Sequence, residues 1–368
     1  MQRILVQCRK ELAQFSRDRL TLALAFVLPM MTLLIFGFAI RLEAKNIPVA
    51  IQDLDNSPLS RSYLEQIFAA QTFQAVPWDG TQPVDMALDR SLAKAAMIIP
   101  PDFSQSLAAG RPNIVQVLVD GTDTNNARVI KNSIKAATNV FLQLRHLIPD
   151  QLPVVVQSRL WFNPGRQEAL YIVPGTYAVV LWIFPSLLSA IAMVREKEQG
   201  TIVQVYASRI SAAELLLGKL AAYVIVGLGM ATAVMGTGVL VFHLTLVGDP
   251  TPLLVGTPLF LSVAVMFGLL LGVRAGNQNA AVQGVSLIGF ITAFLLSGFI
   301  YPLSNIPFPL SVLPNIVPAR YYIGITRDAY VRGVGWSGVW FDMLMLGILG
   351  FLLFNVARRA LSRMQLPD

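Results

Sequence analysis

Long apolar runs separated by polar segments dominate the sequence, and this pattern predicts most of the architecture. The first run, 20–40, contains 21 residues and no charged side chain. An α-helix of about 20 apolar residues crosses the ~30 Å hydrocarbon core of a bilayer. Five further runs are long enough to do the same, and we expect them to span the membrane at 172–194, 220–242, 253–273, 280–300 and 336–357. The pattern therefore predicts a polytopic α-helical membrane protein with six transmembrane helices.

Residues 42–170, between the first two predicted spans, follow a different pattern. Short apolar runs alternate with segments of helical periodicity, and charges of both signs return. We expect strands at 48–51, 73–76, 95–99 and 114–119, and helices at 59–69, 84–92, 102–109 and 125–145. Strands that alternate with helices are typical of a compact α/β domain. Such a domain is thus predicted as an insertion between helices one and two.

The first segment, 1–19, has the pattern of an amphipathic helix. One helical face carries Ile4, Leu5, Cys8, Leu12 and Phe15, and the opposite face carries Arg3, Lys10 and Arg17. A helix of this kind that directly precedes a membrane span is expected to lie in the membrane interface, with its basic face toward anionic headgroups. The alternative is an ordinary N-terminal helix of a soluble protein.

The distribution of Lys and Arg predicts which side of the membrane each segment faces, because these residues collect on the cytoplasmic side. Five precede the first span and three lie in the tail at 358–368: Arg3, Arg9, Lys10, Arg17 and Arg19, then Arg358, Arg359 and Arg363. Both termini are therefore expected in the cytoplasm, and the α/β domain outside it. The proline-rich segment 301–335 is then also outside, as a broken or re-entrant helix.

The composition supports a lipid environment and excludes several classes of function. Of the 368 residues, 55% are hydrophobic and 13% charged, whereas a soluble domain has about 25% charged residues. The net charge of +7 is dispersed beside the apolar runs, which fits membrane topology and not a nucleic-acid partner. With one cysteine, Cys8, and two histidines, neither a disulfide nor a metal cluster is expected in the chain.

Three polar motifs are candidates for sites of chemistry. The pair Asp53 and Asp55 at a strand end could bind a metal or hydrolyse a substrate, and the segment 120–123 superficially resembles a calcium loop. Both are read more readily as hydrogen-bonded turns. Gly218 and Lys219 are followed by Leu220 rather than Ser or Thr, so they do not form a phosphate-binding loop. We therefore expect no ATP site in this chain and no enzymatic activity of its own.

The predicted spans carry almost no ionisable residues, which bears on how the protein is energised. Asp342 lies toward the outer end of the last span, and the other five spans have no charge in their central region. A proton-driven transporter normally carries a buried carboxylate within the membrane. Its absence favours an energy source outside the spans, supplied by a partner.

The second predicted span ends in four consecutive charges, Arg195 to Glu198, followed by Gly200 and Thr201. One interpretation is a stop-transfer flank, which normally consists mainly of Lys and Arg. The other is a docking turn for a soluble partner, because charges of both signs on a short rigid turn can fix register in a groove. The residues alone do not separate these two interpretations.

A family resemblance enters at these residues. The segments 195–201 and 214–220 are similar to the cytoplasmic signature of type-2 ABC exporter permeases. The segment 297–302, with Pro307, Pro318, Tyr321 and Arg327 after it, resembles the last extracytoplasmic region of the same family. The order of elements also resembles that of the members with a large extracytoplasmic domain, a subgroup of drug and hydrophobic-compound exporters.

The resemblance implies a bacterial inner-membrane permease that forms a dimer with a second, identical or paralogous copy. Spans 172–194 and 280–300 would line the dimer interface. ATP and Mg²⁺ would be bound by a separate cytoplasmic ATPase subunit, with no cofactor in this chain, and a periplasmic adaptor is a further expected partner. The implied docking residues are Arg195, Glu196, Lys197, Glu198, Gly200, Thr201, Glu214 and Lys219. The implied outer segment contains Gly298, Pro302, Pro307, Pro318, Tyr321 and Arg327.

Within this set, Glu196 and Glu198 are expected to contact the ATPase, and Gly200 to form the tight turn. The chain departs from the family pattern at Val203, where a glutamate is usual, and at Arg209, where a proline is usual. The alternative function is a membrane-anchored receptor or envelope-assembly component that transports nothing.

Overall fold

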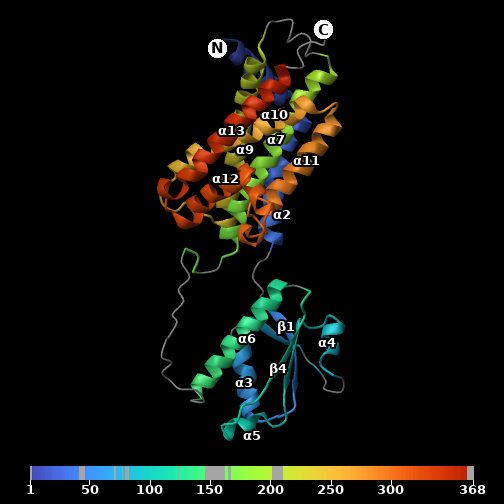
Figure 1. Ribbon diagram of the computed structural model, residues 1–368, viewed down its shortest axis with the longest axis vertical. Coiled ribbons are helices and arrows are strands. Elements are labelled where there is room, and N and C mark those ends of the chain that lie inside the picture. Colours follow the sequence, from blue (N-terminus) through green and yellow to red (C-terminus); the bar gives the residue numbers. More distant parts are fainter. Residues whose placement is uncertain are drawn as a thin grey trace. The chain divides into compact units, whose positions relative to one another are not determined.

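The computed structural model describes residues 2–40, 46–69, 72–76, 78, 83–122, 124–145, 162–164, 167–200 and 210–362. The chain divides into two compact units (Figure 1). One comprises Met1–Ile40 together with Leu160–Asp368, and the other is Arg41–Arg159. We refer to them as the helical unit and the sheet unit, and describe each separately.

The sheet unit contains a four-stranded sheet of order β2-β1-β3-β4. Strand β1 is parallel to β2 and β3, whereas β3 and β4 are antiparallel. The strands are β1 Ile47–Asp53, β2 Phe73–Val76, β3 Ala95–Ile99 and β4 Gln116–Val119. The helices are α3 Pro58–Phe68, α4 Met86–Asp89, α5 Phe103–Ala108 and α6 Thr124–Leu144. These elements lie close to the ranges that the apolar alternation predicts.

Alternation along the strands separates the sheet unit into two cores. Val49 and Met97 point to one face, where they pack with residues of α3, α5 and α6 such as Ile67 and Ile134. Ala50 and Ala96, one position along each strand, point to the other face and pack around α4. Figure 1 shows α4 on the opposite side of the sheet from α3 and α6.

The acidic residues singled out in this unit form turns. Oδ1 of Asp53 accepts hydrogen bonds from the amides of Asp55 and Asn56, and Oδ1 of Asp55 accepts from Ser104. Asp120 accepts from the amide and hydroxyl of Thr122. No group of three or more His, Cys, Asp or Glu that could hold a metal occurs among the described residues. Asp53 and Asp120 therefore form local turns, whereas Asp55 accepts hydrogen bonds from Ser104, 49 positions further along the chain.

The helical unit contains six helices that are long and apolar enough to cross a membrane, counted over the part of the chain described above. They are α2 Arg19–Ala39, α7 Ala169–Glu198, α9 Ala212–Phe242, α10 Thr251–Arg274, α11 Gln278–Leu295 and α13 Trp336–Ser362. Shorter elements complete it: α1 Gln2–Arg17, η1 Leu303–Asn305, η2 Leu310–Ile316, α12 Pro318–Arg327 and η3 Asp328–Arg332.

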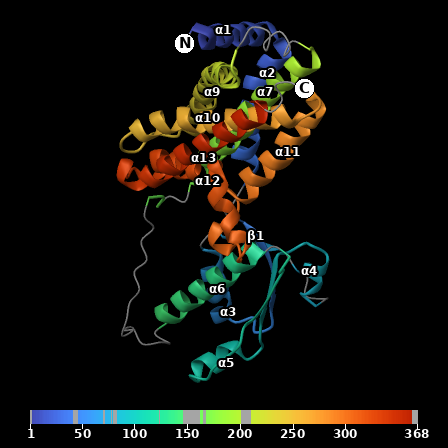
Figure 2. The same cartoon turned by 45° about the horizontal axis from the view of Figure 1, so that its top comes forward.

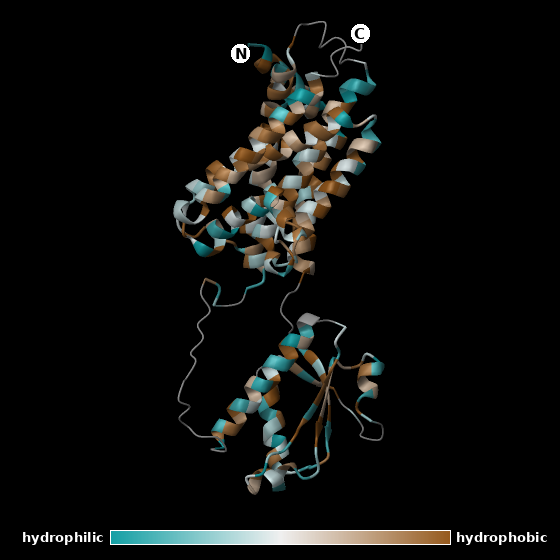
Figure 3. Ribbon diagram, viewed as in Figure 1, coloured by the Kyte–Doolittle hydropathy of each residue, from teal (hydrophilic) through white to brown (hydrophobic). Residues whose placement is uncertain are grey.

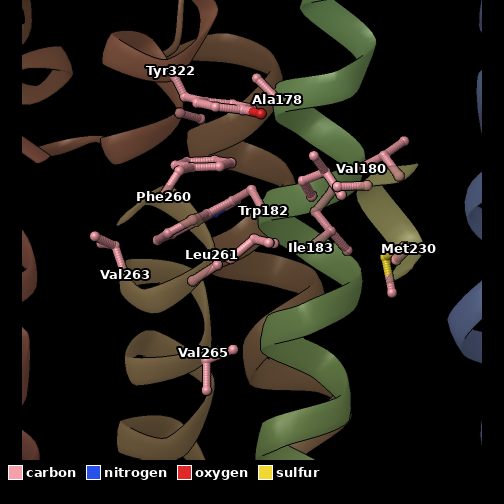
Figure 4. Packing of buried hydrophobic residues seen from close by; sticks show 14 of the residues in the cluster. Ala178, Val180, Trp182, Ile183, Met230, Phe260, Leu261, Val263, Val265 and Tyr322 are labelled. Atoms are coloured by element: carbon pink, nitrogen blue, oxygen red, sulfur yellow. The ribbon is translucent and has the colours of Figure 1, made fainter. Parts of the chain in front are cut away.

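Helix α7 is the centre of this unit. Of the 18 consecutive residues that form its most apolar stretch, 78% are buried. The corresponding share is 17% for both α2 and α13. Aromatic rings line its contact with α10 and α12, as Figure 4 shows: Trp182 stacks near Phe260 with ring centroids 6.0 Å apart, and Phe260 stacks on Tyr322 at 4.1 Å. The span expected to line a dimer interface is thus enclosed mostly by its own chain.

Small residues allow α7 and α10 to approach closely. A Cβ atom at Gly268 would lie 2.0 Å from the Ser186 carbonyl oxygen, and one at Gly272 would lie 2.7 Å from that of Ala190. The hydroxyl of Ser186 also donates to the Ala264 carbonyl across the interface, at 2.8 Å. Two glycines four positions apart, facing small residues, are a recognised device for packing helices within lipid.

Several helices of the helical unit are largely hydrophobic (Figure 3), and many of their large apolar side chains are exposed. Examples are Val27 and Ile35 on α2, Leu287 on α11, and Leu344 and Phe351 on α13. Continuous apolar surface of this kind is unstable in water and requires a covering. Together with the length of the helices, it identifies a multi-pass membrane protein.

Candidate functional site

The four charges at the end of α7 each contact a different part of the helical unit. Arg195 binds the junction between α1 and α2, Glu196 binds α1 and α9, Lys197 binds the end of α10, and Glu198 binds the start of α11. We call residues 195–198, with these partners, the α7 hub. Figure 2 shows α1 lying across this end of the helical unit.

At the centre of the hub is a buried cluster of two acids and a lysine. The ammonium of Lys219 lies 2.6 Å from a carboxylate oxygen of Glu11 and 3.1 Å from one of Glu196. These three residues are 0%, 3% and 4% exposed. Lys10 approaches the second oxygen of Glu196 at 2.5 Å from the more exposed side. Buried charges are tolerated only when they are paired and hydrogen-bonded, and here each has a partner of opposite sign.

Helix α1 packs closely against α9 because α9 has no side chain at the point of contact, Gly218. A Cβ at Gly218 would lie 2.7 Å from the Cβ of Gln7, so only glycine permits this approach. The amide of Gln7 donates to Glu11, and the hydroxyl of Tyr223 also donates to it. The buried face of α1 therefore includes polar groups, whereas Leu5 of the expected apolar face is 61% exposed.

Arg195 ties the junction of α1 and α2 to α7. Its guanidinium lies 3.1 Å from a carboxylate oxygen of Asp18, the N-cap residue of α2. Asp18 accepts from the amides of Leu20 and Thr21 and from the Thr21 hydroxyl. The bonds from Thr21, with a smaller contribution from Arg195, hold the pKa of Asp18 below its usual value.

The remaining two hub charges stabilise the facing ends of α10 and α11. Lys197 donates to the carbonyl oxygens of Val273 and Ala275 at 2.8 and 2.6 Å, where α10 ends with unpaired carbonyls. Glu198 accepts from the amide of Gln278 at 2.8 Å and from its side chain at 2.6 Å, at the start of α11. Each charge also has the sign that the helix dipole favours at that end.

The structure divides the predicted docking residues into buried and exposed groups. Glu196 and Lys219 face inward, while Glu198 and Gly200 are at the surface. Gly200 adopts a left-handed φ of +67° just after the helix, as a C-terminal turn requires. Glu214 forms a capping box with Ser211 and lies 3.8 Å from Arg3. Thr201, Val203 and Arg209 lie outside the described residues.

Two sequence interpretations change at this site. The apolar run predicts a span that begins at 220, after Lys219, but the Ser211–Glu214 capping box starts α9 at Ala212, which puts Lys219 about two turns inside the helix. The basic face of α1 was expected to meet headgroups, but Lys10 pairs with Glu196. Sequence reasoning missed the partners Glu11, Asp18 and Gln278, although Glu11 adjoins the apolar face of α1, where a charge needs a partner.

Asp18 gives a first prediction. Asp18→Ala is expected to lower the free energy of unfolding at pH 7 by about 1 kcal/mol, because α2 loses its N-cap. Since the folded state lowers the pKa of Asp18, its contribution is present above the unfolded pKa of about 4 and is lost as the pH falls through the folded value. The difference between wild type and variant in urea unfolding should therefore shrink from pH 7 to pH 3. Asp18→Asn, which keeps a capping oxygen, is the control, and its free energy of unfolding at pH 7 should fall by less than that of Asp18→Ala.

The outer segment forms a second group of predicted residues. Gly298, with a φ of +80°, turns the chain after α11, and Pro302 and Pro307 flank η1. Pro318 occupies the first turn of α12, where it needs no hydrogen-bond partner. Tyr321 is buried and donates to the Asn315 carbonyl at 2.7 Å.

Arg327 joins the outer segment to α7. Its guanidinium lies over the ring of Tyr171, 4.0 Å from the ring centroid, and donates to the carbonyls of Gly298 and Phe299. Thr326, next to it, donates to the Pro174 carbonyl of α7 at 2.9 Å. The segment is therefore packed into the helical unit at the end of α7 opposite the hub.

A cavity of about 420 Å³ lies between α7, α10, α11, α12 and α13. Its lining is almost entirely apolar and includes Trp182, Phe267, Leu349 and Leu353. The cavity thus suits an apolar molecule.

Comparison with known proteins identifies the family. Residues 19–359 match the ABC-2 family transporter proteins. The chain is 26% identical over 335 residues to the probable multidrug ABC transporter permease YbhS of Escherichia coli (strain K12), covering 90% of this chain and 89% of that protein. It is also 26% identical to the probable multidrug ABC transporter permease YbhR of the same strain, over 95% and 97% of the two chains.

A third relative, the inner membrane transport permease YhhJ of Escherichia coli (strain K12), is 26% identical over 346 residues, 89% of this chain and 91% of that one. The family match over 19–359 includes residues 195–198 and the outer segment. A polytopic helical unit with this order of elements, matched over 19–359, places the chain in the ABC-2 family of transporter proteins, as a permease.

Proposed function

We propose that the chain is the membrane-spanning subunit of an ATP-driven exporter, energised by a separate ATPase subunit that docks at 195–201. ATP and Mg²⁺ would be held by that subunit. The observation that carries the proposal is the α7 hub: the exposed residues Gln199 and Gly200 directly follow charges bound to α1, α9, α10 and α11. A displacement of this surface would be transmitted to most of the helical unit.

The substrate proposed is a drug-like, lipid or other hydrophobic compound, moved out of the cytoplasm or the inner leaflet. The apolar cavity beside Trp182 supports this class, because it offers a volume of about 420 Å³ with few polar groups. Two relatives are named as probable multidrug permeases, which agrees with it.

The proposed topology puts both termini and the hub in the cytoplasm of a bacterial cell, and the sheet unit outside the inner membrane. A second permease copy would pack against the exposed apolar face of α11, which includes Leu287, Phe290 and Ile291. Helix α7 offers little free surface to that copy. A periplasmic adaptor remains a proposed partner of the sheet unit.

The docking proposal predicts that bulk at the hub surface blocks the ATPase. Gln199→Trp is expected to reduce the amount of co-purified ATPase subunit about tenfold, equivalent to about 1.4 kcal/mol, because the larger side chain stands on the docking surface. The tagged permease would be isolated from its native host in mild detergent. Its partners would be identified by mass spectrometry, and the ATP hydrolysis of the complex measured.

Arg358→Trp, on an exposed position of α13, is the matched control and should leave the complex intact. Unchanged ATPase recovery with Gln199→Trp would place the docking surface elsewhere. If the wild-type permease retained no ATP-hydrolysing subunit, the chain would instead be a receptor or assembly component, and the transport proposal would fail.

A further inference from the structure

The helical unit contains a second cavity, with several charged residues in its lining, at the end opposite the hub. It has a volume of about 590 Å³, within the range that holds drug-sized molecules. The first turn of α7, the turn after α11, and α12, η3 and α13 form its walls. Residues of its lining that matter here are Tyr171, Leu303, Arg320, Arg327, Arg332 and Asp342.

Positive charge exceeds negative charge in this lining. Three arginines, Arg320, Arg327 and Arg332, face one carboxylate, Asp342. Arg320 donates to the side chain of Asn315 at 2.6 Å, and Arg332 lies 3.6 Å from Asp328. Arginine is the side chain best suited to carboxylate and phosphate groups, because its planar fork can donate two hydrogen bonds to them at once.

Arg327 is the unusual member of this group. Its guanidinium is held by two carbonyls and the ring of Tyr171, and no carboxylate lies within ion-pair distance of it among the described residues. Its Nε is buried without a hydrogen-bond partner in the same set of residues. A buried charge without a partner of opposite sign is costly, and an anion in the cavity would supply one.

Asp342 lies on the wall of the same cavity. Its carboxylate makes no hydrogen bond or ion pair with the described residues, and it lies against α12 at Gly324, where a Cβ would come within 2.3 Å of Oδ2. Around these charges the lining is apolar, with Leu170, Ile323 and Val331. The cavity therefore combines a positive centre with an apolar wall.

We propose that this cavity binds amphiphilic anions: molecules with an apolar body and a carboxylate, phosphate or sulfonate group that the Arg327 guanidinium receives. The occupant is either a transported compound or the headgroup of an anionic lipid. The proposal rests on the proposed export function only where it names a substrate class, because binding itself needs no ATP.

The test is a fluorescence titration of the full-length permease in phosphatidylcholine nanodiscs with 11-(dansylamino)undecanoic acid, after subtraction of empty nanodiscs. Arg327→Gln is expected to weaken binding about tenfold, as is converting the probe to its methyl ester, since each removes one charge-assisted contact. Asp342→Asn is expected to strengthen binding about threefold, because a like charge leaves the wall.

Arg274→Gln, at an exposed position in the last turn of α10, removes an arginine at the opposite end and should bind the probe as wild type does. Asp342→Asn keeps the shape of the side chain, so it tests the proposal even if Arg327→Gln disturbs the fold. The proposal is overturned if the ester binds as tightly as the acid, or if Asp342→Asn leaves the affinity unchanged.

Phosphatidylglycerol in the nanodiscs separates the two sources of the anion. Displacement of the probe by this lipid, with more of it co-purifying with wild type than with Arg327→Gln, would identify a lipid headgroup as the occupant. Absence of displacement would identify a free amphiphile. A failure of probe binding would leave ATP-driven transport untouched, and a failure to recruit an ATPase would leave the binding result untouched.

Discussion

Lys219→Ala is expected to detach helix α1 from the helical unit. The variant leaves the carboxylates of Glu11 and Glu196 buried without the ammonium that lies between them. Removing one partner of a buried ion pair typically costs about 3–5 kcal/mol, because the remaining charge is uncompensated. Detachment of α1 exposes Glu11 to water and relieves this cost, so it is the expected response.

Cys8 reports this event directly, since it is the single cysteine of the chain and is buried on α1. Burial, and then the nearby Glu11 carboxylate, raise the pKa of the Cys8 thiol, which slows its reaction in the folded protein. Labelling of Cys8 by a maleimide should therefore be slow in wild type. In Lys219→Ala it should be at least about tenfold faster, because detachment of α1 exposes the thiol.

The control replaces the whole cluster with neutral groups of similar shape. Lys219→Met combined with Glu11→Gln and Glu196→Gln removes every charge of the buried cluster at once, and should restore slow labelling, because such exchanges are often neutral or stabilising. Arg358→Ala, at an exposed position, should leave labelling unchanged. Slow labelling of Cys8 in Lys219→Ala would show that the cluster does not hold α1.

Gly268→Ala is expected to disrupt the packing of α7 against α10. The added methyl group would lie 2.0 Å from a backbone oxygen of Ser186 and 2.2 Å from the Ser189 hydroxyl, so the helices must separate. Overpacking typically costs about 1–3 kcal/mol, and backbone on the facing side puts this site at the upper end of that range. The hydrogen bonds from Ser186 and Ser189 to α10 carbonyls would lengthen as well.

The midpoint of thermal unfolding in detergent measures this effect. Gly347→Ala, on α13, is the matched control: a Cβ there meets nothing within 4 Å, and alanine favours helix over glycine, so stability should rise slightly. The unfolding midpoint of Gly272→Ala should lie between those of Gly268→Ala and Gly347→Ala, because the atom nearest to a Cβ at Gly272 is 2.7 Å away. A variant Gly268→Ala as stable as Gly347→Ala would contradict the packing described here.

The hub explains why charges of both signs follow a membrane span. A stop-transfer flank needs only positive charge. Here each sign has a separate role, because Lys197 meets carbonyls at the end of α10, whereas Glu198 meets an amide at the start of α11. The docking proposed for this turn would therefore act on residues that already hold the helices of this unit together.

Much of the secondary structure followed from local pattern. The strands at 73–76 and 95–99 form where the alternation predicts them, since burial of every second residue is encoded in the sequence itself. The start of α9 was less predictable, because it depends on a capping box at Ser211 and Glu214 rather than on hydropathy. The close packing of Gly268 and Gly272 against α7 is indicated by the sequence, because two glycines four positions apart in an apolar run are typical of helix contacts within lipid.

By itself, the sequence determined that the chain has six apolar helices long enough to cross a membrane, carries a separate α/β unit, and ends the second of these helices in four charges. Hydropathy and periodicity are local properties, so the chain states them directly. Only the tertiary structure decided which of the charges face inward. Glu196 meets Lys10, 186 positions away, and Lys219 meets Glu11, 208 positions away. Such pairs form because α1 packs against α9 at Gly218, and no local pattern specifies that contact.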